Sequence, residues 1–194
     1  MGDHVLFFYG TLMAPQILHR VIHGQANPEP WQKAMLRFQP AILHGYRRHR
    51  VQDADYPGIV AARETGTETE KSSSPKTSTG TSVIGTLVSG LTDGDIYRLD
   101  RFEGSDYEKK QVTVCTLREA RGDNKHAGEG VSDENRLREM LDATSTEADE
   151  GEEVSAVTYV YTAGKDMLED AEWDFESFKR DKMAWWVGAD ESEW

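Results

Sequence analysis

Several features that would place this chain in a familiar class are missing from it. Cys115 is the only cysteine among 194 residues, which excludes an internal disulfide framework. No apolar run approaches the roughly 20 residues that cross a membrane, and the N-terminus lacks the basic region and long apolar core of a signal peptide. Basic residues are few: 22 Lys and Arg against 35 Asp and Glu leave a formal net charge of −13. We therefore expect no nucleic-acid partner, no membrane partner and a cytoplasmic location.

Motifs for cofactors and metals are missing as well. The chain has no nucleophile elbow, P-loop or dinucleotide fingerprint, and no Cys/His spacing typical of structural zinc. His19 and His23 are four residues apart, which on one helix face would make them either a metal-binding pair or two exposed histidines. Cys115 lies in an alternating strand pattern, which favours a buried small apolar residue over a nucleophile. We expect no metal and no cofactor.

The length favours a single domain covering residues 1–194, but two segments inside it have unusual composition. Residues 64–82 contain 11 Ser or Thr among 19 and no large apolar side chain. Residues 119–153 contain 12 acidic and 4 basic residues, and a short helix is expected over 133–143. Segments of this kind bury too little apolar surface to offset the entropy lost on ordering. We expect both to be flexible insertions.

The remaining residues show strand and helix patterns. Thr92 and Asp95 have the spacing of a capping box at the start of one helix, and Gly45 interrupts one strand pattern and indicates a bulge or bend. Because strands do not alternate strictly with helices, the pattern predicts an α+β fold with a small, closed or strongly curved sheet. The expected strands are 5–9, 41–51, 59–62, 83–91, 107–118 and 154–162, and the expected helices are 15–23, 31–36, 93–102 and 174–187.

The stretch VLFFYGTLMAP, residues 5–15, combines two local signals. Its apolar, β-prone start is typical of a buried strand, and Pro15 suits the first turn of a helix. Gly10 breaks the strand between them. A strand that ends in a glycine loop at a helix start presents backbone N–H groups that attract an anion or a developing oxyanion. The alternative is an ordinary glycine turn after a buried strand.

Two groups of charged residues are candidates for chemistry. Glu103 lies at the C-terminal end of a predicted helix, beside Phe102 and Gly104. The helix dipole and partial burial both raise the pKa of a carboxyl group in that position, which suits a general base. The alternative is a solvated acid beside a capping glycine. The basic run RRHR, residues 47–50, is either a solvated face or a site for a substrate carboxylate.

The chain contains, in this order, the motifs FFYGTLM, GYRRHRV, DYPGIV, VIGTLVSGL, LDRFEGSDYEKKQVTV, AVTYVY and WDFESF. Together they resemble the γ-glutamylcyclotransferase-like superfamily, and most closely its AIG2-like branch, which includes γ-glutamylamine cyclotransferases. The resemblance covers nearly all of the chain outside residues 64–82 and 119–153. It implies a small mixed, strongly curved β-barrel with flanking helices.

The resemblance also implies a reaction and a set of site residues. In this family the α-amine of a γ-glutamyl substrate attacks its own γ-carbonyl, forms 5-oxoproline and releases an amine, with no cofactor or metal. Glu103 matches the catalytic acid and is assigned as general base. The implied substrate-binding residues are Tyr9, Gly10, Thr11 and Leu12 in the first loop, and Tyr56, Pro57 and Tyr107 at the border of the pocket.

Two alternatives stand beside this assignment. One is a non-catalytic scaffold that uses its acidic insertion to dock a partner. The other is an enzyme of the same fold that acts on a different acyl-amine, such as a transferase. The residues Thr11 and Leu12 differ from the loop of glutathione-directed members, so they favour a γ-glutamyl-amine or a γ-glutamyl amino acid as the small-molecule substrate.

Overall fold

The computed structural model describes residues 2–62, 81–118 and 149–188. The expected insertions therefore lie mostly outside the described residues, as does the helix expected over 133–143. The expectation is wrong at both C-terminal edges, because Ser82 begins one strand and Asp149–Tyr161 forms another. None of the helices in the described ranges has the length and apolar character needed to cross a membrane.

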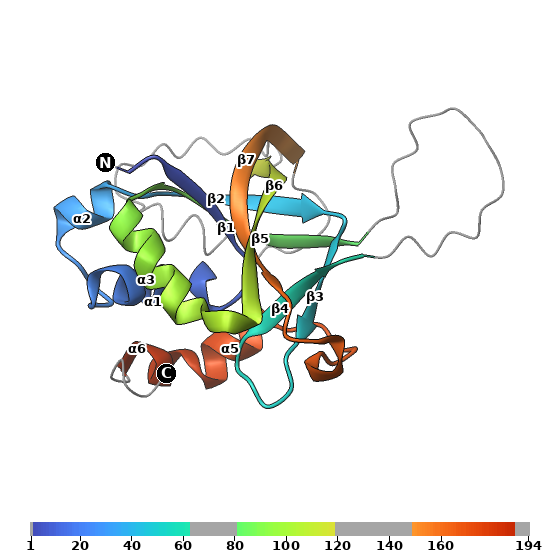
Figure 1. Ribbon diagram of the computed structural model, residues 1–194. Coiled ribbons are helices and arrows are strands. Elements are labelled where there is room, and N and C mark those ends of the chain that lie inside the picture. The colour runs from blue at the N-terminus through green and yellow to red at the C-terminus, as the bar shows by residue number, and fades with distance from the viewer. Residues whose placement is uncertain (1, 63–80, 119–148, 189–194) are drawn as a thin grey trace, which may run out of the picture.

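Five strands form a closed barrel in the order β1-β5-β2-β6-β7 (Figure 1). Neighbouring strands are antiparallel, except that β1 and β7 pair in parallel through Leu6 and Val157. The barrel is therefore mixed, and the predicted α+β class with a closed, strongly curved sheet is confirmed. The strands are β1 (His4–Phe8), β2 (Arg37–His44), β5 (Ser82–Leu91), β6 (Tyr107–Arg118) and β7 (Asp149–Tyr161).

A second sheet of two strands results from the bend at Gly45. The stretch 41–51, expected as one interrupted strand, ends its barrel part at His44 and continues as β3 (Tyr46–Arg50) in the other sheet, paired with β4 (Pro57–Ala61). Gly45 has φ of +81°, a conformation that costs a residue with a Cβ free energy. This bend directs β3 and β4 away from the barrel wall (Figure 1).

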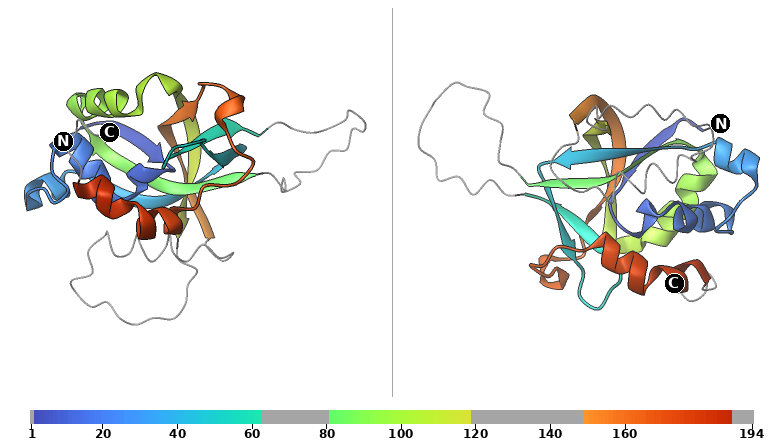
Figure 2. Two further views of the ribbon diagram at one scale, coloured as in Figure 1. Left: turned by 90° about the horizontal axis from the view of Figure 1, so that it is seen from below. Right: turned by 180° about the vertical axis from the view of Figure 1, so that it is seen from behind.

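Helices gather on one side of the barrel, as Figures 1 and 2 show. The predicted capping box of α3 is present, since Thr92 accepts a hydrogen bond from Asp95 N and Asp95 accepts one from Thr92 N. The helix expected over 174–187 begins next to Asp174, which caps it, but is divided at Lys182 into α5 and α6. The α-helices are α1 (Pro15–His23), α2 (Pro30–Ala34), α3 (Asp93–Glu103), α5 (Phe175–Asp181) and α6 (Met183–Gly188).

The side chains of β1 are buried on both faces of the strand, which explains why its sequence is a continuous apolar run. Phe7 packs with Leu87, Val114 and residues of the other strands inside the barrel. Leu6 and Phe8 belong to a separate cluster with the helices, which includes Leu18 of α1, Leu99 of α3 and Trp186 of α6. The end of β1 thus lies between the barrel and the helices.

Candidate active site

The loop that follows β1 approaches a second loop from the other sheet. A Cβ on Gly10 would lie 2.8 Å from Cδ of Pro57, closer than ordinary carbon–carbon contact allows. Contact with Pro57 therefore favours glycine at this position. The carbonyl of Gly10 accepts a hydrogen bond from Met13 N at 3.0 Å, which closes the short helical turn η1 (Thr11–Met13).

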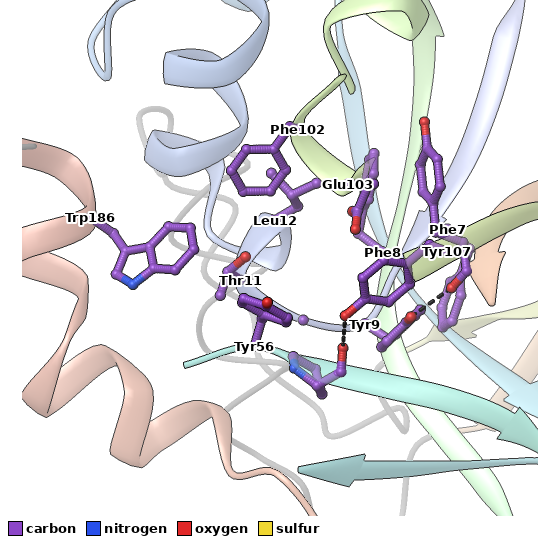
Figure 3. A pocket seen from close by; sticks show the side chains of 13 residues that line it. Phe7, Phe8, Tyr9, Thr11, Leu12, Tyr56, Phe102, Glu103, Tyr107 and Trp186 are labelled. Carbon is purple, nitrogen blue, oxygen red and sulfur yellow. Dashed lines mark hydrogen bonds between the residues drawn. The ribbon is translucent and has the colours of Figure 1, made fainter. Parts of the chain in front are cut away.

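A cavity of about 170 Å³ opens between this loop and the end of α3 (Figure 3). A cavity of roughly 150 Å³ holds a molecule the size of benzene, so this one has room for a small ring. It brings together every residue that the family resemblance nominated: Tyr9, Gly10, Thr11, Leu12, Tyr56, Pro57, Glu103 and Tyr107. The sequence missed five further lining residues, all apolar or aromatic: Phe7, Phe8, Phe102, Tyr159 and Trp186.

Glu103 is the acidic residue of this lining. It is the last residue of α3, and Gly104 ends the helix with φ of +70°. Within the described residues, its carboxyl group has no hydrogen bond and no ion pair. Burial, with a further contribution from the charge of Asp100, raises the pKa of Glu103 to about 8. The upward direction agrees with the prediction, but its second cause is a neighbouring carboxylate.

Asp100 lies one helical turn before Glu103 and is held in place by two donors. Its Oδ1 accepts a hydrogen bond from the hydroxyl of Tyr159 at 2.8 Å, and its Oδ2 accepts one from Nζ of Lys109 at 2.7 Å. The two bonds satisfy the Asp100 carboxylate in its charged form. The charge of Asp100 disfavours a second charge on Glu103 beside it.

Three of the four tyrosine hydroxyls in the lining are already engaged, that of Tyr159 by Asp100. The hydroxyl of Tyr9 donates to the carbonyl of Tyr159 at 2.6 Å, and that of Tyr107 donates to the carbonyl of Pro57 at 2.8 Å, as the dashed lines of Figure 3 show. Burial raises the pKa of both hydroxyls, so both remain neutral donors. These two tyrosines fix the cavity wall and present their rings to its interior.

The first loop also supplies backbone donors. The N–H groups of Gly10, Thr11 and Leu12 open the turn η1, and no hydrogen bond from any of them is found in the described part of the chain. The first N–H groups of a helical turn have no partner within the turn itself. Since all three residues line the cavity, this end of the site is suited to a negatively charged group.

The basic run 47–50 is exposed only in part, at Arg47 and Arg50, and none of its residues lines the cavity. Arg48 is mostly buried, and its Nη1 donates to the carbonyl of Tyr9 at 2.9 Å, while its Nη2 donates to Glu172 at 3.2 Å. Arg47 and His49 form hydrogen bonds with the carbonyls of Asp170 and Glu169. These hydrogen bonds connect β3 to the segment before α5, and Arg48 also connects β3 to Tyr9 at the start of the first loop.

The histidine pair also differs from both expectations. His19 is 1% exposed and packs against Phe38, with its ring stacked on His23 at 5.4 Å between centroids. Burial, together with the nearby charges of His23 and Lys33, lowers the pKa of His19 to about 4. His19 is therefore a neutral core residue at pH 7. Cys115, expected to be buried, is only partly so.

Comparison with known proteins agrees with the fold and the loop motifs. Residues 6–128, more than half of the chain, match the family model described as gamma-glutamyl cyclotransferase, AIG2-like. "Protein AIG2 C" of Arabidopsis thaliana is 25% identical over 177 residues, covering 91% of this chain and 73% of the relative. "AIG2-like protein C" of the same organism is 26% identical over 175 residues, covering 90% and 69%.

Among solved structures, the solution structure of another Arabidopsis thaliana protein matches this fold with a TM-score of 0.50 and 24% identity, covering 95% of this chain and 77% of that one. The family match supports an activity of the γ-glutamyl cyclotransferase type in general terms. The closed mixed barrel, the loop after β1 and the sequence match lead to one conclusion: the chain belongs to the AIG2-like gamma-glutamyl cyclotransferase family.

Proposed function

We propose that this protein is a γ-glutamylcyclotransferase that converts a γ-glutamyl-amine or a γ-glutamyl amino acid into 5-oxoproline and a free amine. The observation that carries the proposal is the Glu103 carboxyl group. It lines the cavity with the first loop, lacks a partner within the described residues, and has its pKa raised to about 8. A carboxyl group whose pKa lies near the working pH can both accept and return a proton.

The two kinds of polar group in the cavity lining complement the two charges of a glutamyl group. The substrate's α-ammonium would lie against Glu103, and its negatively charged α-carboxylate or developing oxyanion would lie against the N–H groups of Gly10, Thr11 and Leu12. Each donor aimed at a developing oxyanion can contribute about 2.7–4 kcal/mol to lowering the barrier. The apolar and aromatic walls exclude water, which strengthens both interactions.

The reaction balances without a further reactant. Glu103 takes a proton from the α-ammonium, the resulting amine nitrogen attacks the γ-carbonyl carbon, and a C–N bond forms. The bond from that carbon to the leaving nitrogen then breaks as Glu103 returns its proton to that nitrogen. The attacking nitrogen loses a second proton as it becomes the lactam N–H, and this proton ends on the free amine, which leaves as an ammonium ion. Because the attack is intramolecular, the protein mainly holds the substrate folded in a near-attack geometry. A cavity with room for a small ring suits the five-membered lactam.

The reaction class is tested by the products formed from a panel of γ-glutamyl-amines, γ-glutamyl amino acids and glutathione. We expect 5-oxoproline and the free amine in equal amounts, with γ-glutamyl-amines or amino acids preferred over glutathione. Release of glutamate in place of 5-oxoproline would identify a hydrolase, and transfer of the acyl group to an added amine would identify a transferase. No turnover on any member of the panel would favour a binding protein.

A further inference from the structure

Three potential metal ligands lie together on the outside of the barrel, far from the cavity. They are His44 of β2, Cys115 of β6 and Glu150 of β7, and one donor atom of each lies within 4.8 Å of the other two. Cys115 is eight residues along β6 from Tyr107 of the cavity, which corresponds to roughly 26 Å. The cluster is therefore separate from the proposed reaction site.

Strand register explains why the three side chains share a face. Ile42 pairs with Cys115, and His44, two residues beyond Ile42, points to the same side of the sheet. On both strands the alternate residues, Leu43 and Val114, are buried in the barrel. The cluster therefore projects outward, where an ion in solution can reach it.

A β-bulge brings Glu150 to this face. Cys115 pairs with Glu153 and Leu117 pairs with Glu150, so the register shifts by one residue between them. In an unshifted ladder Leu117 would oppose Gly151, and Glu150 would point to the opposite side. A Cβ at Gly151 would lie 2.6 Å from Oγ1 of Thr116, so the bulge needs glycine there. Bulges of this kind often orient side chains beside functional sites.

We propose that His44, Cys115 and Glu150 bind a divalent transition-metal ion, with Zn²⁺ the ion that these donors favour. Zinc takes nitrogen, thiolate and carboxylate ligands in tetrahedral geometry with bonds of about 2.0–2.3 Å, which places neighbouring ligand atoms roughly 3.5 Å apart. His44 Nε2 and Glu150 Oε1 are already 2.8 Å apart, so modest side-chain movement completes the geometry. Water or Glu153, opposite Cys115, supplies the fourth ligand.

Binding at this site is coupled to a proton. Partial burial, together with the nearby carboxylates of Glu150 and Glu153, raises the pKa of the Cys115 thiol. The thiol must lose its proton to solvent as the metal–sulfur bond forms. The bound ion links β2, β6 and β7 at this end of the barrel.

The test is a titration of the reduced full-length protein with Co²⁺, a coloured substitute for Zn²⁺, followed by absorption. We expect a thiolate-to-cobalt charge-transfer band that saturates at one equivalent and disappears when Zn²⁺ is added. Cys115→Ser removes the band, and His44→Gln or Glu150→Gln each weakens binding by at least about tenfold. Zn²⁺ also raises the Tm of the wild type but not of Cys115→Ser.

The matched control is His4→Gln. His4 forms an exposed pair with Asp93 at 2.6 Å, similar to the His44–Glu150 pair but outside the three-residue cluster. This variant should bind Co²⁺ as the wild type does. Absence of a thiolate band in the wild type, or unchanged affinity in Cys115→Ser, would overturn the proposal, because any ion bound would then be held by other acidic residues.

Discussion

At the scale of single residues, Glu103 and Asp100 form an unequal pair of carboxyl groups. Asp100 accepts hydrogen bonds from Lys109 and from the hydroxyl of Tyr159. Glu103, with burial and the charge of Asp100 acting on it, has a pKa of about 8. The charge of Asp100 thus contributes to the raised pKa of Glu103. The proposed base is therefore mostly protonated at pH 7 until an ammonium group binds beside it.

This pair predicts the pH dependence of kcat/KM. The base must be unprotonated in the free enzyme, so kcat/KM should fall by about tenfold per pH unit below pH 8. Asp100→Asn removes the neighbouring charge, lowers the pKa of Glu103 and moves this acid limb to lower pH. Asp93→Asn, on the first turn of the same helix, is the control and should leave the limb in place. An acid limb that does not move in Asp100→Asn would contradict this account.

His19 predicts a loss of stability in acid. Its pKa is lowered in the folded state from 6.5 to about 4, so the unfolded chain binds the proton more readily as the pH falls below 6.5. Between pH 6.5 and 4 this difference removes about 3 kcal/mol from the free energy of unfolding. Urea unfolding across this range should show a smaller acid loss in His19→Leu than in the wild type. An equal loss in both, with exposed His4→Gln as reference, would exclude His19 as the cause.

The residue-level predictions succeeded where the signal was local and failed where the partner was distant in sequence. The upward direction of the Glu103 pKa was predicted from its place at a helix end beside Phe102, although its causes are burial and the charge of Asp100. The role of Arg48 was not predicted, because its partner Glu172 is 124 residues away. His19 falls on the apolar face of α1 with Leu18 and Ile22, a pattern that predicts burial more strongly than metal binding.

At the scale of elements, the contact between the first loop and Pro57 fixes the shape of the site. Gly10→Ala would introduce a Cβ that lies 2.8 Å from the Pro57 ring. We expect a lower kcat/KM, because the loop must move, and a loss of about 1–3 kcal/mol in stability, as for other overpacked sites. Gly94→Ala is the control, because its added Cβ meets only Thr92 Oγ1 at 3.7 Å. Equal activity in Gly10→Ala and the wild type would show that loop position is not critical.

Element positions were predicted well, but their connections were not. The capping box fixes the start of α3 to the residue, and β6 has the expected bounds. The change of sheet at Gly45 and the break at Lys182 depend on what packs against the chain, which no local pattern records. The bulge at Gly151 is of the same kind, since only pairing with β6 reveals it.

At the scale of the whole molecule, the barrel is closed by the pairing of β1 with β7. In that pairing Leu6 lies opposite Val157. Two side-chain hydrogen bonds reinforce it: the hydroxyl of Thr158 donates to the carbonyl of Phe7 at 2.9 Å, and that of Tyr9 donates to the carbonyl of Tyr159. The contacts that close the barrel thus include Tyr9, a residue of the proposed site.

Removing the first of these bonds should weaken the barrel as a whole. Thr158 is fully buried, so Thr158→Val keeps the shape but leaves the carbonyl of Phe7 without this donor. We expect the free energy of unfolding to fall by about 1–3 kcal/mol in urea denaturation, with a single cooperative transition. Thr158→Ser, which keeps a hydroxyl, should lose less. Equal stability of the valine variant and the wild type would show that this hydrogen bond does not stabilise the pairing of β1 with β7.

The class of the fold could be predicted from the sequence, but the order of its strands could not. Short strands interrupted by glycine indicated a closed sheet, whereas β1 pairs with β5 and β7, which lie far along the chain. The eight nominated site residues came from motif resemblance and line one cavity. Trp186 and the His44–Cys115–Glu150 cluster went unnoticed because each depends on elements brought together only by folding.

The most direct test of the central claim is the release of 5-oxoproline by Glu103→Gln, measured with the best substrate of the wild type. Glutamine keeps the size of the side chain but cannot accept the proton, so we predict a fall in kcat of at least about 100-fold. KM and thermal stability should change little. Glu108→Gln, an exposed change on β6, should retain full activity. If Glu103→Gln releases 5-oxoproline as fast as the wild type, Glu103 is not the base and the proposed mechanism is wrong.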